Sequence, residues 1–472
     1  MLVAREKEAE LLRSSLDDEY SQFVAVYGRR RVGKTFLVRE SFGYDFTFQH
    51  AGLAEGGLRD QLFAFSESLK DAGLSGFAQP SSWLEAFSLL KELIRRSADG
   101  KKVIFIDELS WMDTPKSGLI TALENFWNGW ASGRKDVVLI VCASATSWMM
   151  SKVVHNKGGL YNRLTKQINL RPFTLRECEE MLVAKGIELS RHQILECYMI
   201  MGGVPFYWDH LQRGKSLAQN IDAVFFAQDA PLKNEFKYLY ASLFRHPADY
   251  LAIVSALARR KAGMTREEII ESTSLADSGA LTKKLGELES CGFVRSYRAF
   301  GKKKRGSLYQ LVDNYTLFYY KFLEGGNSDE RYWENSAGSG GRSAWCGLAF
   351  ERVCLEHVPQ IKRALGISGV ITEVGAWSCK ADPDNGVYGS QVDLLIDRRD
   401  QIVNLCEMKF AADDFTITKD VEESLRHKAS DFKALAKTRS AVHVTLVTTY
   451  GVKEGKYSGA VQSVVTSDDL FS

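Results

Sequence analysis

The residues best suited to chemistry lie near the start of the chain. Gly28 is followed, after four further residues, by the run Gly33-Lys34-Thr35. Backbone N–H groups of such a loop can wrap the phosphates of a nucleotide, Lys34 can neutralise their charge, and Thr35 can bind Mg²⁺. An ordinary glycine turn is the alternative, but an apolar run precedes this loop and a helical stretch follows it, as a phosphate loop requires. The expected ATP contacts are Gly28, Arg29, Arg30, Arg31, Val32, Gly33, Lys34, Thr35 and Phe36.

A second segment ends in two neighbouring carboxylates. Residues 101–109 read Lys-Lys-Val-Ile-Phe-Ile-Asp-Glu-Leu, which predicts a buried strand that ends in Asp107 and Glu108. At the end of a buried strand, Asp107 can hold Mg²⁺ through water and Glu108 can polarise the water that attacks the γ-phosphate. Two acids after a strand can also cap a helix. The phosphate loop upstream makes the nucleotide site the stronger interpretation.

These motifs need a sheet to position them. A chain of 472 residues exceeds what one core normally organises, so we expect two to four domains. In residues 1–172, strand-like runs alternate with helical patterns, which predicts an α/β P-loop ATPase core with a parallel sheet. The expected strands are residues 23–27, 45–49, 103–107, 137–142 and 167–170.

Three further domains are expected downstream. Residues 173–231 carry only helical periodicity, beginning with the capping box Thr174-Leu-Arg-Glu177, and predict a helical lid. Residues 232–325 read as short helices followed by a two-stranded hairpin, which favours a winged helix. Segments rich in glycine and serine then mark a boundary before a last domain at 340–472.

The last domain holds a second group of chemical residues. Two strand-like runs predict a hairpin that carries Asp393 on one strand, and Glu407 and Lys409 on the other. Alternation puts Glu407 and Lys409 on one face, and the partner strand can bring Asp393 beside them. This pattern resembles the PD-(D/E)xK nuclease core, in which two acids, here Asp393 and Glu407, bind Mg²⁺ and the lysine activates water. The resemblance implies Glu351 as the upstream acid. The alternatives are a solvent-facing hairpin and a nuclease fold that only binds DNA.

A basic turn suggests DNA as a partner. Residues 301–306 read Gly-Lys-Lys-Lys-Arg-Gly, and four cations in a hairpin turn suit phosphate contact without sequence specificity. Residues 279–289 are the candidate recognition helix, with Lys283 and Lys284 outward. A solvated basic turn is the alternative. The predicted DNA contacts are Lys302, Lys303, Lys304 and Arg305.

Most of the chain resembles the prokaryotic AAA-type ATPases, related to the STAND and archaeal ATPase group, that carry a C-terminal nuclease-like domain. Arg5 and Glu6 resemble that family's opening box, which helps frame the adenine site. The run 137–144 resembles the family's sensor strand, which implies Ser144 or Thr146 near the γ-phosphate. A serine ending a strand can also be a simple cap.

The resemblance implies two further features. Gly158-Gly-Leu-Tyr-Asn-Arg163 resembles the segment that donates an arginine to a neighbouring subunit's nucleotide, which makes Arg163 the arginine-finger candidate and would require a homo-oligomer. A surface arginine in a salt bridge is the alternative. Gly202-Gly-Val-Pro205 resembles the family's lid motif, although no arginine lies beside it.

Composition limits the classes of function. A net charge of +2 argues against a global polyanion binder but permits local basic patches. Eight scattered cysteines without a C-x-x-C pair indicate reduced core thiols. The early charges and the lack of a long apolar run predict no signal peptide, no membrane span and a cytoplasmic location. The leading hypothesis is an ATP-driven protein that processes DNA. The alternative is a regulatory ATPase switch whose last domain binds DNA or protein without cutting.

Overall fold

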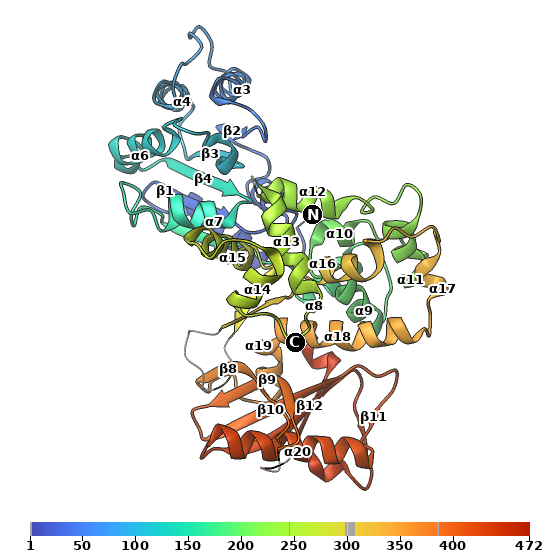
Figure 1. Ribbon diagram of the computed structural model, residues 1–472. Coiled ribbons are helices and arrows are strands. Elements are labelled where there is room, and N and C mark those ends of the chain that lie inside the picture. Colours follow the sequence, from blue (N-terminus) through green and yellow to red (C-terminus); the bar gives the residue numbers. More distant parts are fainter. Residues whose placement is uncertain (1, 245, 298–299, 301–306, 383, 385–386) are drawn as a thin grey trace. The chain divides into compact units, whose positions relative to one another are not determined.

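The computed structural model describes residues 2–244, 246–297, 300, 307–382, 384 and 387–472. The chain divides into two compact units. The first comprises Met1–Pro172 and Leu239–Arg245, and the second comprises Phe173–Tyr238 and His246–Ser472. Figure 1 shows the helices and strands of each unit and labels many of them.

The first unit is built on a five-stranded parallel sheet in the order β2-β3-β4-β1-β5. Every residue of β1, β3 and β4 is buried, as expected for strands covered on both faces. Strand β2 begins three residues later than predicted, because Asp45 closes a turn by donating to the Phe42 carbonyl. The strands are β1 (Gln22–Tyr27), β2 (Phe48–Ala51), β3 (Lys102–Asp107), β4 (Val137–Ala143) and β5 (Lys166–Asn169).

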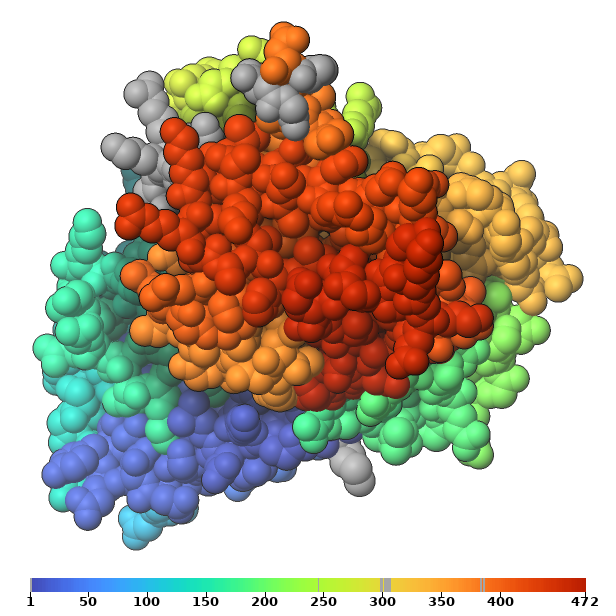
Figure 2. All heavy atoms as spheres, turned by 90° about the horizontal axis from the view of Figure 1, so that it is seen from below, coloured from blue at the N-terminus to red at the C-terminus, as the bar shows by residue number. Residues whose placement is uncertain are grey.

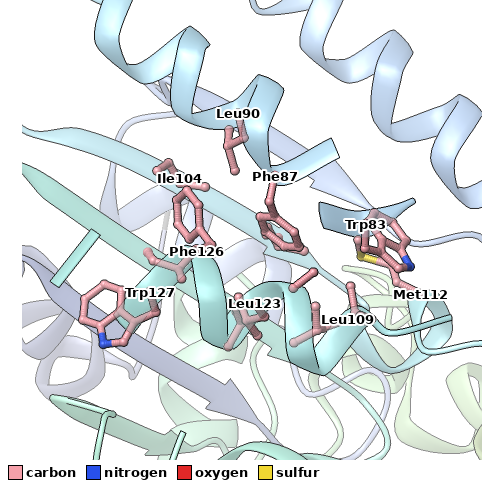
Figure 3. Packing of buried hydrophobic residues seen from close by; sticks show 14 of the residues in the cluster. Trp83, Phe87, Leu90, Ile104, Leu109, Met112, Leu123, Phe126 and Trp127 are labelled. Atoms are coloured by element: carbon pink, nitrogen blue, oxygen red, sulfur yellow. The ribbon is translucent and has the colours of Figure 1, made fainter. Parts of the chain in front are cut away.

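Helices cover this sheet and form its larger core with it. Figure 3 shows Phe87 of α4 and Phe126 of α6 facing each other, with ring centroids 5.3 Å apart. Aromatic side chains of this size dominate core energetics, so this cluster holds the helices on the sheet that carries the phosphate loop. The helices are α1 (Glu6–Asp17), α2 (Lys34–Ser41), α3 (Leu58–Asp71), α4 (Trp83–Arg96), α5 (Leu109–Met112), α6 (Leu119–Gly129) and α7 (Thr146–Met149).

The second unit begins with the helical segment that the sequence predicted. The capping box of Thr174 and Glu177 is confirmed at the start of α8. At Gly203, a Cβ atom would lie 1.8 Å from the Phe173 carbonyl oxygen, so only glycine fits this close turn between α9 and α10. The helices are α8 (Leu175–Ala184), α9 (Arg191–Met201), α10 (Pro205–Asp209) and α11 (Leu217–Ile221). They are followed by α12 (Glu235–Leu243), whose residues from Leu239 on belong to the first unit.

Three helices and an antiparallel pair of strands follow. Leucines 281, 285 and 288 of α15 are buried, as its spacing predicted. Strands β6 and β7 pair in antiparallel register, with Val294 opposite Leu311. The elements are α13 (Pro247–Ala258), α14 (Arg266–Thr273), α15 (Gly279–Ser290), β6 (Val294–Tyr297), β7 (Leu308–Leu311), α16 (Asn314–Phe318), the π-helix η4 (Tyr319–Leu323) and α17 (Tyr332–Asn335).

The C-terminal part holds a mixed five-stranded sheet in the order β14-β12-β10-β9-β8. Strands β8, β9 and β10 are antiparallel, whereas β10, β12 and β14 run parallel. Figure 1 shows α18 and α20 on opposite sides of this sheet, and Figure 2 shows its surface in orange to red. The elements are α18 (Gly340–Glu356), α19 (Val358–Ala364), β8 (Thr372–Cys379), β9 (Ser390–Arg398), β10 (Ile402–Lys409), β11 (Phe415–Thr416), α20 (Lys419–Ala436), β12 (Ala441–Thr448), β13 (Val452–Lys453) and β14 (Ser463–Thr466).

The cysteines and the longest helices bear on the expectations from composition. All eight cysteines are free thiols, and all are buried except Cys379, which is half-buried. In the part of the chain that the structure describes, no helix combines the length and the apolar character needed to span a membrane.

Candidate nucleotide and phosphodiester sites

The phosphate loop is the turn between β1 and α2. At Gly28, with φ of 149°, a Cβ atom would lie 2.1 Å from the carbonyl oxygen of Leu170, so the close approach of the residue that follows β5 requires glycine. Gly33 has φ of 90° and precedes α2 in the left-handed conformation. Val32 is buried in the core beneath the loop. The loop is therefore fixed in place by its glycines and by one apolar anchor.

Lys34 and Glu108 are joined through Ser144. The Lys34 ammonium group donates to the Ser144 hydroxyl at 3.0 Å and to the Gly28 and Arg29 carbonyl oxygens at 2.9 and 3.0 Å. The Ser144 hydroxyl donates to Oε1 of Glu108 at 2.6 Å, and the Ser144 backbone N–H donates to Oε2 at 3.2 Å. Three residues predicted from separate segments thus form one chain of hydrogen bonds, buried at Lys34 and Ser144 and partly exposed at Glu108.

Glu108 is held in an unusual backbone conformation. Its φ of 45° lies in the left-handed region, which a residue with a side chain seldom adopts, and it immediately precedes α5. Strain of this kind concentrates at functional sites and persists only where surrounding contacts enforce it. The two bonds from Ser144 are such contacts.

Thr35 and Asp107 supply oxygen ligands suited to Mg²⁺. The Thr35 hydroxyl donates to Oδ2 of Asp107 at 2.5 Å, and the Glu108 backbone N–H donates to Oδ1 at 2.9 Å. A hydroxyl and one carboxylate fit Mg²⁺, which takes hard oxygen ligands and keeps several waters beside substrate phosphates. When bound, the ion would neutralise phosphate charge.

The other predicted nucleotide residues differ in exposure. Arg29 is buried, Arg30 and Arg31 are half-buried, and Phe36 is exposed on α2. Arg5 is buried and donates to the Arg171 carbonyl oxygen at 2.5 Å, which ties the start of the chain to the end of β5.

The arginine-finger candidate is exposed. Arg163 lies in the loop before β5 and makes no ion pair among the described residues, so the salt-bridge alternative has no support there. The preceding segment is anchored to α6, since the Gly159 N–H donates to Glu124 at 3.1 Å and Asn128 donates to the Gly159 carbonyl at 2.6 Å. This anchoring presents Arg163 on the surface of the first unit.

A hollow that no sequence motif indicated lies beside Asp107. It has a volume of about 360 Å³ and is lined by Arg39, His50 and Asp107, among others. Burial lowers the pKa of His50 to about 4, so this imidazole is neutral at physiological pH. Its Nδ1 atom lies 2.9 Å from the Ser68 hydroxyl. A single histidine in a short strand carries no motif, so spacing alone could not have identified it.

The four predicted residues of the C-terminal site separate into two pairs. Lys261 donates to Glu351 at 2.9 Å and lies 3.9 Å from Asp393, which also accepts from Gln391 at 2.7 Å. Burial, reinforced by the charge of Asp393, raises the pKa of Glu351. Glu351 and Asp393 therefore share one lysine.

The other pair lies toward α20. Glu407 accepts from Lys409 at 2.9 Å, which confirms that the two share a face, and from Lys428 of α20 at 2.7 Å. Among the described residues, no group of three His, Cys, Asp or Glu side chains is placed to hold a metal ion. In this arrangement Asp393 is paired with Lys261, whereas Glu407 is paired with Lys409 and Lys428.

A β-bulge explains the separation. Gly375 pairs with Leu395 and Trp377 with Val392, so two steps on β8 match three on β9. Val392 and Leu395 consequently pack on the same side, both in the cluster with Phe432 of α20. Asp393, lying between them, is directed toward Lys261 instead.

The structure describes only some of the residues that were predicted to contact DNA. Lys302, Lys303, Lys304 and Arg305 lie outside the described residues. On α15, Lys283 is exposed as expected, but Lys284 is half-buried and lies 3.2 Å from Asp249 of α13. Lys283 is the more exposed of the two, although it lies 3.9 Å from Glu287 on the same helix.

Comparison with known proteins agrees with the geometry of the first unit. Residues 2–211 match the sequence profile of a family described as an ATPase domain predominantly from Archaea. An uncharacterised protein of Methanocaldococcus jannaschii, MJECL04, is 23% identical over 405 residues, which cover 84% of each chain.

Solved structures give weaker likenesses. The Walker-type ATPase PABY2304 of Pyrococcus abyssi is 16% identical with a TM-score of 0.44, over 67% of this chain and 95% of that one. The ORC2 protein of Aeropyrum pernix is 15% identical with a TM-score of 0.43, over 76% of this chain and 96% of that one.

Proposed function

We propose, from the premise that residues 2–211 are an archaeal-type ATPase domain, that this protein binds and hydrolyses ATP and uses the cycle to act on DNA. The observation that carries the proposal is the hydrogen-bonded chain from Lys34 through Ser144 to Glu108, beside the Thr35–Asp107 pair. It supports roles for Lys34 as the phosphate-binding cation, for Thr35 and Asp107 as Mg²⁺ ligands, and for Glu108 as the base.

Each of these residues has a task in hydrolysis. Lys34 neutralises phosphate charge, and Glu108 orients the attacking water and accepts its proton. Ser144 touches both, so it keeps the carboxylate of Glu108 at a fixed place relative to Lys34. Fixed donors and acceptors lower the barrier because they need no reorganisation during reaction.

We assign Arg163 as a finger that stabilises charge on a neighbouring subunit's nucleotide. Arg163→Ala should then leave ATP binding unchanged and lower turnover by roughly 1,000-fold. Because the finger acts in trans, mixing the Arg163→Ala and Lys34→Ala proteins should restore part of the activity that each lacks. Arg13→Ala, which removes another exposed arginine of the first unit, is the control. A mixture as inactive as its components would contradict action in trans.

Action on DNA rests on the second unit. The helices α13 to α15 with the β6–β7 hairpin support a winged helix within 232–325. The order α18, β8, β9, β10, α20, β12, with helices on both faces, supports a PD-(D/E)xK-like domain at 340–472. We propose that these two parts bind DNA and that the second cuts it with Mg²⁺.

A second candidate function is a regulatory ATPase switch whose last domain binds DNA or protein without cleavage. The observation that favours it is the separation of Asp393 from Glu407, each held by a lysine. Acids that are paired with lysines in this way have a structural role, unless the binding of DNA and Mg²⁺ brings Asp393 and Glu407 close to each other.

DNA cleavage by the purified chain separates the two candidates. If the domain is a nuclease, the wild type should cut DNA with Mg²⁺, and Glu407→Ala and Lys409→Ala should each lower the rate by about 100-fold or more. Glu423→Ala removes a more exposed acid of α20 and should have no effect. Unchanged cleavage in Glu407→Ala would remove this site from the reaction. No cleavage of any DNA, with ATP hydrolysis intact, would favour the switch.

A further inference from the structure

A second cavity lies wholly within the second unit, apart from the phosphate loop. It has a volume of about 280 Å³ and is lined by residues of α9, α13, β7, α16, η4 and α18 and by the segment after α13. This volume is close to the lower end of pockets that hold small molecules, about 300 Å³. We call it the Arg352 pocket, after the residue that characterises it.

Arg352 is buried, being only 5% exposed, and is incompletely paired. Its Nη2 atom donates to the Lys261 carbonyl oxygen at 2.6 Å, whereas Nη1 is buried with no hydrogen-bond partner. Glu351 and Asp393 act on it electrostatically, but neither forms an ion pair with it. A buried guanidinium that lacks a carboxylate is strongly destabilising unless an anion completes it. The pocket that Arg352 lines is where such an anion would enter.

Other cations surround the same cavity. Arg259, Arg260 and Lys321 line it, are exposed, and form no ion pair among the described residues. Cations at Arg259 and Arg260 also suit the C-terminus of α13. Stabilisation of this helix end does not account for the presence of Lys321 on η4 or of Arg352 on α18. Among the described residues that line the pocket, Glu324 is the only acid, so the excess charge of this lining is positive.

The rest of the lining is apolar and aromatic. Trp345 and Arg352 lie seven residues apart on one face of α18, and Tyr320 of η4 faces the same cavity. Asn314 lines it too, and its Oδ1 atom is a buried acceptor without a partner. An occupant that satisfies the whole lining needs a negative group, a flat apolar body and a hydrogen-bond donor.

We propose that the Arg352 pocket binds a nucleoside phosphate, either free or at the end of a nucleic acid strand. Arg352, Arg259 and Lys321 receive the phosphate, and the base lies among the apolar and aromatic side chains, where Asn314 accepts a hydrogen bond from its exocyclic amine or ring N–H. The site is independent of the phosphate loop. It gives the second unit its own means of sensing nucleotide or a strand end.

Calorimetric titration of the Lys34→Ala protein tests this proposal, because that variant is expected to bind nucleotide much more weakly at the phosphate loop. The probes are the four common nucleoside monophosphates, adenosine, inorganic phosphate and a short 5′-phosphorylated DNA strand. We expect at least one monophosphate or the strand to bind more tightly than adenosine or phosphate. Tighter binding of the strand, if Arg259→Gln and Lys321→Gln weaken it, identifies the strand end as the ligand, and tighter binding of a monophosphate identifies free nucleotide.

Variants locate the binding. Arg259→Gln and Lys321→Gln, on the exposed rim, should each weaken it by about tenfold, as expected for loss of one charge-assisted hydrogen bond. Arg363→Gln, an exposed arginine of α19 outside the pocket, should have no effect. Arg352→Gln should abolish binding. If the Arg352→Gln protein does not fold, the two rim variants, Arg259→Gln and Lys321→Gln, still test whether the probe binds in this pocket. Binding of none of the probes, binding no tighter than that of phosphate, or binding unchanged in both rim variants would overturn the proposal.

Discussion

Replacing Glu108 by glutamine is expected to lower ATP turnover by roughly 100- to 1,000-fold while leaving ATP binding unchanged. Glutamine keeps the shape of the side chain and can still accept the bond from the Ser144 hydroxyl. It cannot take a proton from the attacking water. Steady-state phosphate release and equilibrium binding of a fluorescent ATP analogue measure the two effects separately.

The matched control for this variant is Glu55→Gln, which neutralises an exposed acid of the same unit. It should retain wild-type turnover and binding. If the Glu108→Gln protein turns over ATP within about threefold of wild type, a change smaller than loss of a general base produces, Glu108 is not the base. Equal loss of binding and turnover would mean that the strained backbone at Glu108 had moved.

Replacing Lys34 by alanine is expected to weaken ATP binding by about 100-fold or more, and turnover should fall with it. Lys34 is only 5% exposed and supplies the ammonium group at the centre of the loop. Its loss removes a positive charge from a buried site where phosphate oxygens need neutralising. Titration with ATP and Mg²⁺ measures the affinity.

Lys34 also joins the Gly28 and Arg29 carbonyls, so a change in the loop itself must be separated from loss of charge. Lys34→Met keeps most of the buried stem and removes only the charge, and it should bind ATP as weakly as Lys34→Ala. Lys7→Ala, at an exposed position of α1, should bind normally. Wild-type affinity in Lys34→Met, with an unchanged melting temperature, would contradict the assigned role.

The first unit was largely predictable because its signals are local. The phosphate loop and the pair Asp107 and Glu108 each occupy a few consecutive residues at the end of an apolar strand. Since parallel strands bring their carboxyl ends to one edge of a sheet, Ser144 could be expected near them without knowledge of the contacts. What no local pattern contained was the shared hydrogen-bonded chain from Lys34 to Glu108.

The C-terminal site was less predictable because its contacts come from distant segments. Alternation correctly placed Glu407 and Lys409 together, but a bulge in β9 turned Asp393 away, and one extra residue in a strand leaves no mark in the sequence. The lysines that hold the two acids, Lys261 and Lys428, lie far along the chain from their partners. The Arg352 pocket could not be predicted from the sequence either, because its lining residues come from elements that are far apart in the chain.

One assay tests the central claim most directly: phosphate release from ATP by the intact chain, with and without Mg²⁺ and DNA, beside the Lys34→Ala protein. ATP hydrolysis at this site predicts release that requires Mg²⁺, rises when DNA is added, and is lost in Lys34→Ala. Release that persists in Lys34→Ala, or no release by the wild type under any of these conditions, would contradict it.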